Sequence, residues 1–239
     1  MYEQIPNTRW GMIGRRFLSW IELRLLRNYK RDPREQEGLE TIRAIYARQS
    51  SMLSILLRDA TTVLFSPGDL LNLWAHARAM RDHGGAFAEV GAFTGDSAEV
   101  TCKAKGDRAF YVFEAFAGLR SGGSSDDRFR RGMFASSEAD LRHRLERYPN
   151  TTVVAGYFPE TAAAIERQEF SYVHLDVDLY QDTLEALRFF YPRMLPGGRI
   201  ISHDYGQCEG VWRAFDEFFA DKREKVEPIG AVQVLVIKA

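Results

Sequence analysis

The spacing of apolar residues changes from helical to strand-like at about residue 81. Up to that point apolar side chains recur at helical intervals, first in an arm over residues 1–34 and then over residues 35–59. Ser66, followed by a proline and by the carboxylate of Asp69, offers a capping hydroxyl and an acidic first turn. This pattern predicts a helix that starts at Ser66 and ends near Arg81.

Five short apolar runs follow, each bounded by glycine or acidic residues and separated mostly by segments of helical composition. They cover residues 86–90, 109–113, 152–155, 172–175 and 199–202. Such alternation predicts an α/β fold, in which a parallel sheet carries crossover helices on both faces.

The end of the chain departs from this alternation. After a helical segment over residues 209–222 come two strand-like runs, 225–229 and 231–237, which are joined at Gly230. Runs so close together can pair only as an antiparallel hairpin. We therefore expect a mostly parallel sheet that is closed by an antiparallel C-terminal hairpin.

The composition is that of an ordinary globular protein. Of the 239 residues, 45% are hydrophobic and 27% are charged, which supplies a sizeable core and excludes a disordered, collagenous or polytopic membrane protein. The two cysteines, Cys102 and Cys208, are far apart and fit neither a disulfide framework nor the ligand spacing of a zinc site. A reducing cytoplasm is the location that we expect.

The charge is distributed unevenly along the chain. Basic and acidic side chains nearly cancel, 32 against 33, but residues 1–34 hold eight basic and three acidic ones and so carry +5, against −6 for the rest. The acidic bulk of the chain argues against nucleic acid as a partner. Charges also interrupt the apolar residues of the arm, which argues against a membrane span and against a secretion signal.

The arm is interpreted as an amphipathic, basic helix with aromatic residues. Such a helix fits an anionic membrane surface, but packing on its own domain or on a second subunit is the commoner use and the one that we favour. We therefore expect a homo-oligomer. The chain divides into a helical arm over residues 1–65, for oligomerisation, as a lid or for membrane-surface contact, and a main domain over residues 66–239.

A glycine-containing turn follows the first apolar run. Glu89, Gly91, Gly95 and Ser97 form an acid-x-Gly-x-x-x-Gly-x-Ser pattern. Ligands of open α/β sheets bind at the carboxyl ends of the strands, where glycines let the backbone approach a ligand. The carboxylate beside this turn suits a ligand with a cationic amine better than a pyrophosphate. An ordinary strand-to-helix turn is the alternative interpretation.

Glu114 ends the second apolar run, 25 residues after Glu89. This is near the offset at which a strand-end acid holds the ribose hydroxyls of an adenosine ligand. The flanking residues are strongly apolar, which weakens the alternative of a solvated glutamate. Glu114 is therefore the candidate for binding ribose.

Acidic residues cluster after the fourth and fifth runs. Asp176 and Asp178 follow the fourth run, and His203 and Asp204 follow the fifth. On neighbouring strands these carboxylates would repel one another unless a cation neutralised them, and oxygen ligands suit Mg²⁺ or a similar hard ion. The alternative is that one or two of the acids cap the following helices, but Asp182 can already cap the helix after the fourth run.

Two further features have structural interpretations. His174 lies inside the apolar fourth run and is predicted to be a buried, hydrogen-bonded histidine rather than a ligand. Residues 120–131 are charged, contain two glycines and follow the second run. They suit a lid over an anionic or glycosylated substrate, but we favour a solvated loop.

The acidic cluster and its surroundings also carry a resemblance to a known family. The segments LDVDLYQDTLEALRFFYPRMLPGG and HDYGQCEGVWRAFDEFF resemble the macrocin O-methyltransferase family of sugar and macrolide tailoring enzymes, and EVGAFTGDS, VFEAFAGL and GYFPET match further family segments. The resemblance covers residue 67 to the C-terminus. It implies a Rossmann-like class I methyltransferase fold with a seven-stranded sheet, S-adenosylmethionine (SAM) as methyl donor, and a divalent metal that positions a substrate hydroxyl.

The resemblance also assigns site residues. Those implied for SAM are Glu89, Gly91, Gly95 and Ser97 at the methionine part, Glu114 at the ribose, and Asp176 beside them. Asp178 and Asp204 would bind Mg²⁺. Where the family usually has two consecutive acids this chain has His203-Asp204, so His203 either ligates a softer ion or turns away and acts as a base. Asp178 is the first candidate for the catalytic base and His203 the second.

The predicted function is SAM- and metal-dependent O-methylation of a hydroxylated small molecule, a sugar or a glycosylated natural product. A metal bound to vicinal hydroxyls would lower the pKa of the acceptor and fix its oxygen for in-line transfer. Two alternatives stay open. One is a binding or scaffold protein of methyltransferase fold without transfer activity, and the other is a metal-dependent oxygenase component related to cephalosporin hydroxylase.

Overall fold

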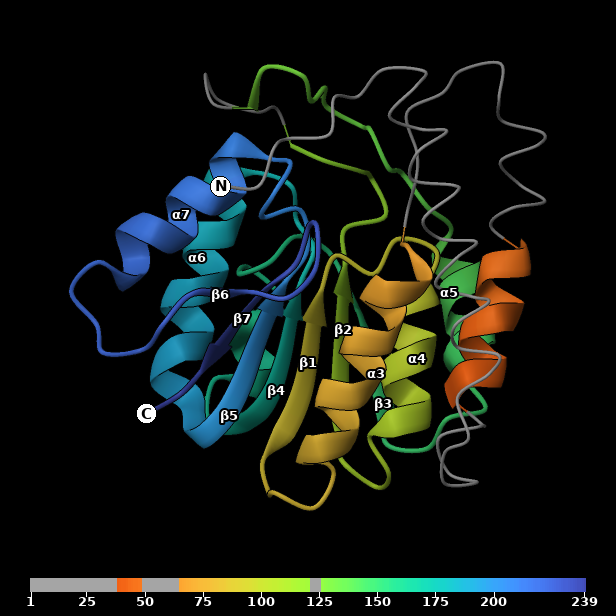
Figure 1. The fold of residues 1–239 in the computed structure, drawn as a ribbon. Helices are drawn as coiled ribbons and strands as arrows, with labels where there is room; N and C mark the ends of the chain where they lie inside the picture. Colours follow the sequence, from red (N-terminus) through yellow and green to blue (C-terminus); the bar gives the residue numbers. More distant parts are fainter. Residues whose placement is uncertain (1–37, 49–64, 121–125) are drawn as a thin grey trace.

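A seven-stranded sheet forms the centre of the protein (Figure 1). The computed structural model describes residues 38–48, 65–120 and 126–239. The strands are β1 (Ala86–Val90), β2 (Phe110–Glu114), β3 (Thr151–Ala155), β4 (Phe170–Leu175), β5 (Met194–Ser202), β6 (Glu227–Pro228) and β7 (Val234–Ile237). Their order is β3-β2-β1-β4-β5-β7-β6, with β7 antiparallel to β5 and β6 and the other neighbours parallel.

The antiparallel C-terminal hairpin is confirmed, but it is shorter than the sequence predicts. β6 holds two residues instead of the predicted 225–229, and β7 begins at Val234. Pro228 has no amide hydrogen and so donates no backbone hydrogen bond on this edge strand. The connection is closed by Ile229 N, which donates to Gln233 O at 2.9 Å.

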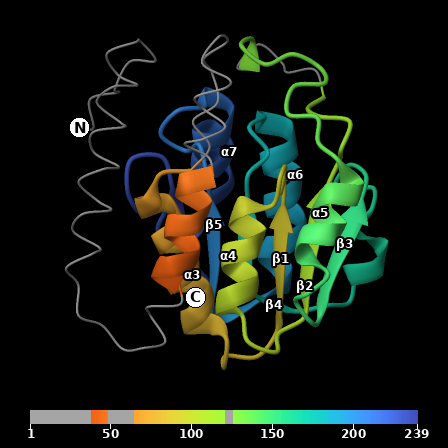
Figure 2. The same cartoon turned by 90° about the vertical axis from the view of Figure 1, so that its right-hand side faces the viewer.

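Helices cover both faces of the sheet (Figure 1, Figure 2). One layer holds α3 (Pro67–Met80), α4 (Asp96–Ala104) and α5 (Glu138–Leu145), and the other holds α6 (Tyr180–Phe190) and α7 (Glu209–Phe219). Short 3₁₀ turns, η2 (Ala162–Ile165) and η3 (Tyr191–Arg193), precede β4 and β5. The predicted α/β alternation with crossover helices on both faces is therefore confirmed.

The helix start predicted at Ser66 is confirmed by a capping box. Ser66 Oγ accepts a hydrogen bond from Asp69 N at 3.1 Å, and Asp69 Oδ2 accepts one from Ser66 N at 2.9 Å. The two bonds satisfy amides that the first turn of a helix leaves without partners. α3 ends at Met80, one residue before the predicted end.

Alternate residues of the strands supply two hydrophobic clusters, one on each face of the sheet. In β1, Ala88 and Val90 belong to the cluster that contains Phe190 and Phe215, whereas Phe87 belongs to the other cluster. All residues of β1 are buried. Burial on both faces explains why this strand appears in the sequence as a continuous apolar run.

A helix over residues 38–48 adds to the second cluster through Ile42 and Ile45, which are 0% and 1% exposed. This agrees with an accessory helix within residues 35–59. The remaining arm residues, 1–37 and 49–64, lie outside the described part of the chain, so the division at residue 65 and the uses of the arm stay predictions. Among the helices that the structure does describe, none is long and apolar enough to cross a membrane.

Candidate active site

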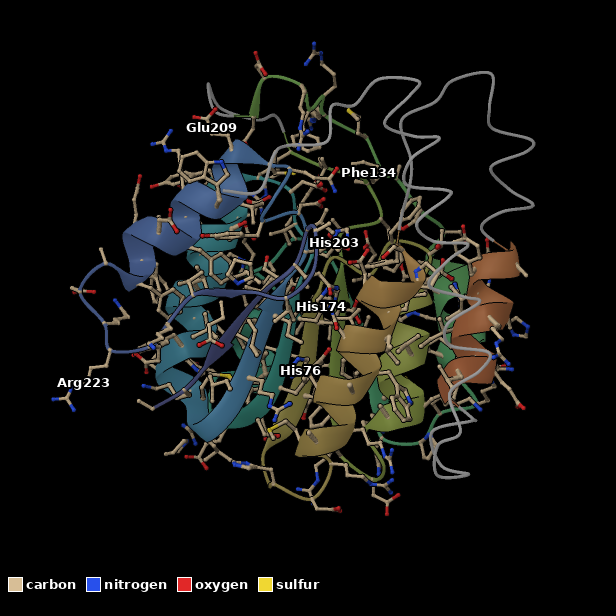
Figure 3. The ribbon with its side chains drawn as sticks, viewed as in Figure 1. His76, Phe134, His174, His203, Glu209 and Arg223 are labelled. Carbon is tan, nitrogen blue, oxygen red and sulfur yellow. The ribbon has the colours of Figure 1, made fainter. Side chains whose placement is uncertain are left out.

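A cavity of about 370 Å³ lies at the carboxyl ends of β1, β2, β4 and β5. Its size suits a small-molecule ligand. Figure 3 shows His203 at this end of the sheet, below Phe134, with His174 and His76 further down. The residues that line the cavity come largely from the loops after the strands, which is where open α/β sheets bind their ligands.

Gly91 marks the point at which the loop after β1 touches the loop after β4. Its φ is +87°, and a Cβ atom built on it would lie 1.8 Å from the carbonyl oxygen of Asp176. Asp176 N also donates to Val90 O at 2.9 Å, which fixes this close approach. Gly91 and Asp176 both line the cavity, so the structure brings these two predicted cofactor residues together.

Glu114 joins two loops at the cavity wall. Its Oε2 accepts from Phe93 N at 2.6 Å and its Oε1 accepts from Phe116 N at 3.0 Å. Burial raises the pKa of the Glu114 carboxyl, although these amide hydrogen bonds lower it. The side chain thus lies at the end of β2, beside the turn after β1, where a ribose-binding acid is expected.

The other residues predicted to bind the cofactor lie behind the cavity wall. Glu89 is fully buried, accepts a hydrogen bond from Ser97 Oγ, and lies 3.0 Å from His174 Nδ1. Gly95 precedes α4 with a φ of +88°. The prediction that His174 is a buried, hydrogen-bonded histidine is confirmed. The contacts observed for Glu89, Gly95 and Ser97 shape the turn, and their contact with a cofactor stays a prediction.

Asp178 and Asp204 meet at the ends of β4 and β5. Both have left-handed backbone conformations, with φ of +60° and +61°, which aspartate tolerates better than most residues. Burial, together with the nearby carboxylates of Asp204 and Asp176, raises the pKa of Asp178 well above its usual range. Carboxylates that repel one another in this way are expected where a cation binds.

His203 lies beside these acids and under an aromatic ring. Its Nδ1 is 3.3 Å from Asp204 Oδ2 and 3.6 Å from Asp176 Oδ1, and its ring centroid is 4.6 Å from that of Phe65. Burial lowers the pKa of His203, but Asp204 and Asp176 outweigh burial and hold the pKa well above its usual range. His203 therefore groups with Asp176 and Asp204, whereas the sequence placed it with Asp178 and Asp204.

Cys208 belongs to the site although sequence reasoning assigned it no role. Its Sγ and a carboxylate oxygen from each of Asp178 and Asp204 lie within 4.8 Å of one another. Cys208 N donates to the carbonyl oxygen of Asp204 at 2.8 Å, so a tight turn returns the cysteine to the acid. The signal that the sequence did offer is a cysteine four residues after a predicted metal ligand.

The segment after β2 forms another wall of the cavity. Its lining side chains are Arg120, Arg128, Phe129, Met133 and Phe134. Phe129 is 8% exposed, and the ring of Phe134 lies 6.0 Å from that of Phe93. The favoured prediction of a solvated loop over residues 120–131 is therefore wrong for Phe129, which packs over the cavity, whereas Asp127, Arg128, Arg130 and Arg131 are exposed as predicted. Residues 121–125 lie outside the described part of the chain.

Asp182 faces the same cavity from the first turn of α6. Arg120 Nε lies 3.9 Å from Asp182 Oδ1, while the Arg120 guanidinium donates to both carboxylate oxygens of Glu160 at 2.7 Å and lies 4.2 Å from the ring centroid of Tyr157. Burial raises the pKa of Asp182 to about 6, although Arg120 lowers it. The Asp182 side chain is only 17% exposed, and Arg120 contacts it at the long distance of 3.9 Å. Its carboxylate is therefore available to a ligand in the cavity.

The predicted capping role of Asp182 is wrong. Leu179 occupies the N-cap position of α6 and supplies no side-chain hydrogen bond. Asp126, from the segment after β2, accepts from Tyr180 N at 3.0 Å instead. A residue distant in sequence thus replaces the local cap, and Asp182 is left facing the cavity.

Replacing Asp182 with asparagine is expected to stabilise the protein at neutral pH. Because its pKa is about 6 in the folded state, against about 4 in the unfolded chain, the folded protein holds this proton more tightly. The protonated carboxyl favours folding fully below about pH 4, and this contribution is lost as the pH rises through about 6. In urea unfolding at pH 7, the free energy of unfolding of Asp182→Asn should exceed that of wild type by about 2 to 3 kcal/mol. Near pH 4 the two free energies should differ little.

The control for this variant is Asp82→Asn, which removes one charge from a carboxylate that is 94% exposed. If Asp182→Asn and Asp82→Asn change stability equally at both pH values, the assignment of a raised pKa to Asp182 is wrong.

The strand order, together with the acid after β2 and the acids after β4 and β5, defines a class I methyltransferase fold. The model of the macrocin O-methyltransferase (TylF) family matches residues 74–237. The chain belongs to this family, which confirms the resemblance found in the sequence.

Two curated relatives are natural-product enzymes of Streptomyces. Demethyldecarbamoylnovobiocin O-methyltransferase of Streptomyces niveus is 27% identical over 126 residues, 48% of each chain. The 8-demethyl-8-(2,3-dimethoxy-alpha-L-rhamnosyl)-tetracenomycin-C 4'-O-methyltransferase of Streptomyces olivaceus is 30% identical over 138 residues, 51% of this chain and 53% of the relative. The matches thus span about half the length of these relatives.

Solved structures share the fold. The O-methyltransferase NovP has a TM-score of 0.66 at 22% identity, covering 73% of this chain and 81% of its own. The calicheamicin methyltransferase CalS11 has a TM-score of 0.64 at 17% identity, covering 87% and 94%. An O-methyltransferase from Bacillus cereus, solved in complex with SAH, has a TM-score of 0.58 at 14% identity, covering 88% and 93%.

Proposed function

We propose that this protein transfers a methyl group from SAM to a hydroxyl of a small molecule, a sugar or a glycosylated natural product, with the help of a divalent metal. The observation that carries the proposal is that Glu114 and the pair Asp178 and Asp204 line the same cavity. A candidate ribose-binding acid and a candidate cation site therefore face one space. Family membership and the relatives' printed activities support the same reaction.

Three cavity residues support the binding of SAM. Glu114 lines the cavity, and a carboxylate that accepts backbone amides from the loops after β1 and β2 can also accept ribose hydroxyls. Gly91 lets the loop after β1 approach Asp176, so that both residues lie on the cavity wall. Asp176, whose side chain is 18% exposed, offers a negative charge to a cationic ligand.

The donor set at the ends of β4 and β5 fits a divalent ion. Asp178 and Asp204 would hold it, since their carboxylates are close enough to raise the pKa of Asp178 and would be relieved by a cation. When bound, such an ion lowers the pKa of an acceptor hydroxyl and fixes its oxygen. Mg²⁺ is the ion that the sequence predicted, and its presence stays a prediction.

The remaining roles follow from where each side chain lies. Asp178 lines the cavity beside the proposed metal, which suits a carboxylate that takes a proton from the acceptor. His203 also lines the cavity, but its Nδ1 faces two carboxylates that raise its pKa, so we assign it to holding these acids and rank it behind Asp178 as a base. Phe129 and Phe134 cover the cavity and would exclude water from the transfer.

Other features of the predicted function rest on the sequence. A homo-oligomer, a cytoplasmic location and a small-molecule partner rather than nucleic acid stay predictions. Contact of the basic arm with a membrane surface concerns residues outside the described ranges.

Glu114→Gln is expected to weaken SAM binding by about 10- to 100-fold, because the amide loses the charge that strengthens hydrogen bonds to ribose hydroxyls. Isothermal titration with SAM measures this change. Glu146→Gln is the matched control, since the Glu146 side chain is 66% exposed, and it should leave the affinity unchanged.

Three results, two from these titrations and one from a methyl-transfer assay, would bear on the proposal. Equal affinity in Glu114→Gln and wild type would remove Glu114 from the cofactor site. A wild-type protein that binds no SAM would refute the proposed function. SAM binding without methyl transfer to a panel of glycosides would support the scaffold alternative.

A further inference from the structure

Cys208 immediately precedes α7 and lies close to Asp178 and Asp204. We propose that its thiolate is a third protein ligand of the metal, in addition to these two carboxylates. Two carboxylates and one thiolate favour a borderline ion such as Zn²⁺, Co²⁺ or Fe²⁺ over Mg²⁺. The inference rests on the proposed function only in placing a metal at these two acids. It concerns a residue that was not predicted from the sequence to bind a metal.

The geometry brings three donors to one point. Cys208 Sγ and the oxygens of Asp178 and Asp204 lie within 4.8 Å of one another, and all three residues line the cavity. The carbonyl oxygen of Asp204 accepts both Gln207 N at 2.9 Å and Cys208 N at 2.8 Å. These two bonds form a tight turn that holds the backbone of Cys208 beside that of Asp204.

Arg128 supplies the second, independent observation. A guanidinium nitrogen of Arg128 donates to Cys208 Sγ, and the guanidinium carbon lies 4.8 Å from the ring centroid of Phe129. Because arginine has no acceptor, the sulfur must be the acceptor of this bond. A charged donor directed at a buried sulfur is the kind of outer contact that orients metal ligands. On binding, the metal ion replaces the thiol proton, which is released to solvent.

The imidazole of His203 is directed elsewhere. Its Nδ1 faces Asp204 and Asp176, and its Nε2 lies 3.9 Å from Asp69 Oδ2. The two groups of potential ligands share Asp204, but Asp178 belongs to the group that contains the cysteine. Cys208 is therefore better placed than His203 to complete a site on Asp178.

The test is a titration of the metal-free full chain with Co²⁺, without SAM or acceptor, followed by absorption spectroscopy. A thiolate ligand gives a sulfur-to-cobalt charge-transfer band in the near ultraviolet. We expect this band in wild type, its persistence in a large excess of Mg²⁺, and its loss in Cys208→Ser. Cys102→Ser is the matched control, because Cys102 is the other buried cysteine and lies on α4; it should retain the full band.

Two outcomes would overturn the proposal. One is Co²⁺ binding, measured by isothermal titration, without a charge-transfer band in wild type, which would show oxygen or nitrogen ligands only. The other is a band that persists in Cys208→Ser. Since neither measurement involves SAM, their failure is distinct from a failure of the proposed methyl transfer.

X-ray absorption of the Zn²⁺-loaded wild type tests the same point without a variant, in case Cys208→Ser does not fold. We expect one sulfur scatterer at about 2.3 Å from zinc in addition to the lighter ligands. A fit that needs only oxygen and nitrogen scatterers would refute the assignment of Cys208.

Discussion

Asp178→Asn is expected to lower kcat for methyl transfer by at least about a hundredfold while leaving SAM affinity within about twofold. Asp178 is both a candidate metal ligand and a candidate base, whereas the ribose is assigned to Glu114 at the end of β2. Asparagine is the appropriate replacement because it also tolerates the φ of +60° found at this position, so a loss of activity would not arise from backbone strain.

The stability of this variant provides an internal check. The pKa of Asp178 is raised by burial and by neighbouring carboxylates, so the ionised side chain destabilises the fold at neutral pH. Asp178→Asn should therefore unfold at a temperature equal to or above that of wild type. Asp221→Asn, at a carboxylate that is 83% exposed, is the control and should retain full turnover. Unchanged turnover in Asp178→Asn would refute its assignment to the reaction.

Gly91→Ala is expected to destabilise the protein by about 3 to 5 kcal/mol and to abolish SAM binding. The new Cβ atom would lie 1.8 Å from the carbonyl oxygen of Asp176, and the φ of +87° is itself unfavourable for alanine. The overlap can be relieved only if the ends of β1 and β4 separate. This separation would break the hydrogen bond that Asp176 N donates to Val90 O. Urea unfolding and titration with SAM measure the two effects.

Gly84→Ala separates steric overlap from backbone strain. Gly84 also has a positive φ, +99°, but the nearest atom to its added Cβ would be Leu195 Cδ1 at 3.9 Å. We expect this control to lose only about 1 to 2 kcal/mol and to bind SAM normally. If both variants were destabilised equally, the contact between Gly91 and Asp176 would not be the cause.

The fold was predictable because its pattern is local. Each buried strand appears as an apolar run, and Ser66 and Asp69 mark the helix start that the sequence indicated. The strand ends were less predictable, since pairing depends on the neighbouring strand. β6 shows this, because only Glu227 and Pro228 pair with β7 although residues 225–229 have strand-like composition.

The site was predictable only where it depends on strand ends. Asp178 and Asp204 lie within three residues of the ends of β4 and β5, so adjacent strands were enough to bring them together. The contacts of Asp182 and Cys208 depend on Arg120, Arg128 and other parts of the segment after β2, which no periodicity places. The burial of Glu89 against His174 is likewise a tertiary contact that the sequence did not indicate, and its predicted contact with the cofactor stays untested.

Phe65 lies at the end of the predicted arm, yet its ring packs on His203 and lines the cavity. The boundary at residue 65 therefore runs through the pocket wall rather than between two independent units. An exchange of arms between related enzymes would carry a piece of this wall with it, so acceptor preference and the contacts of the arm would be inherited together.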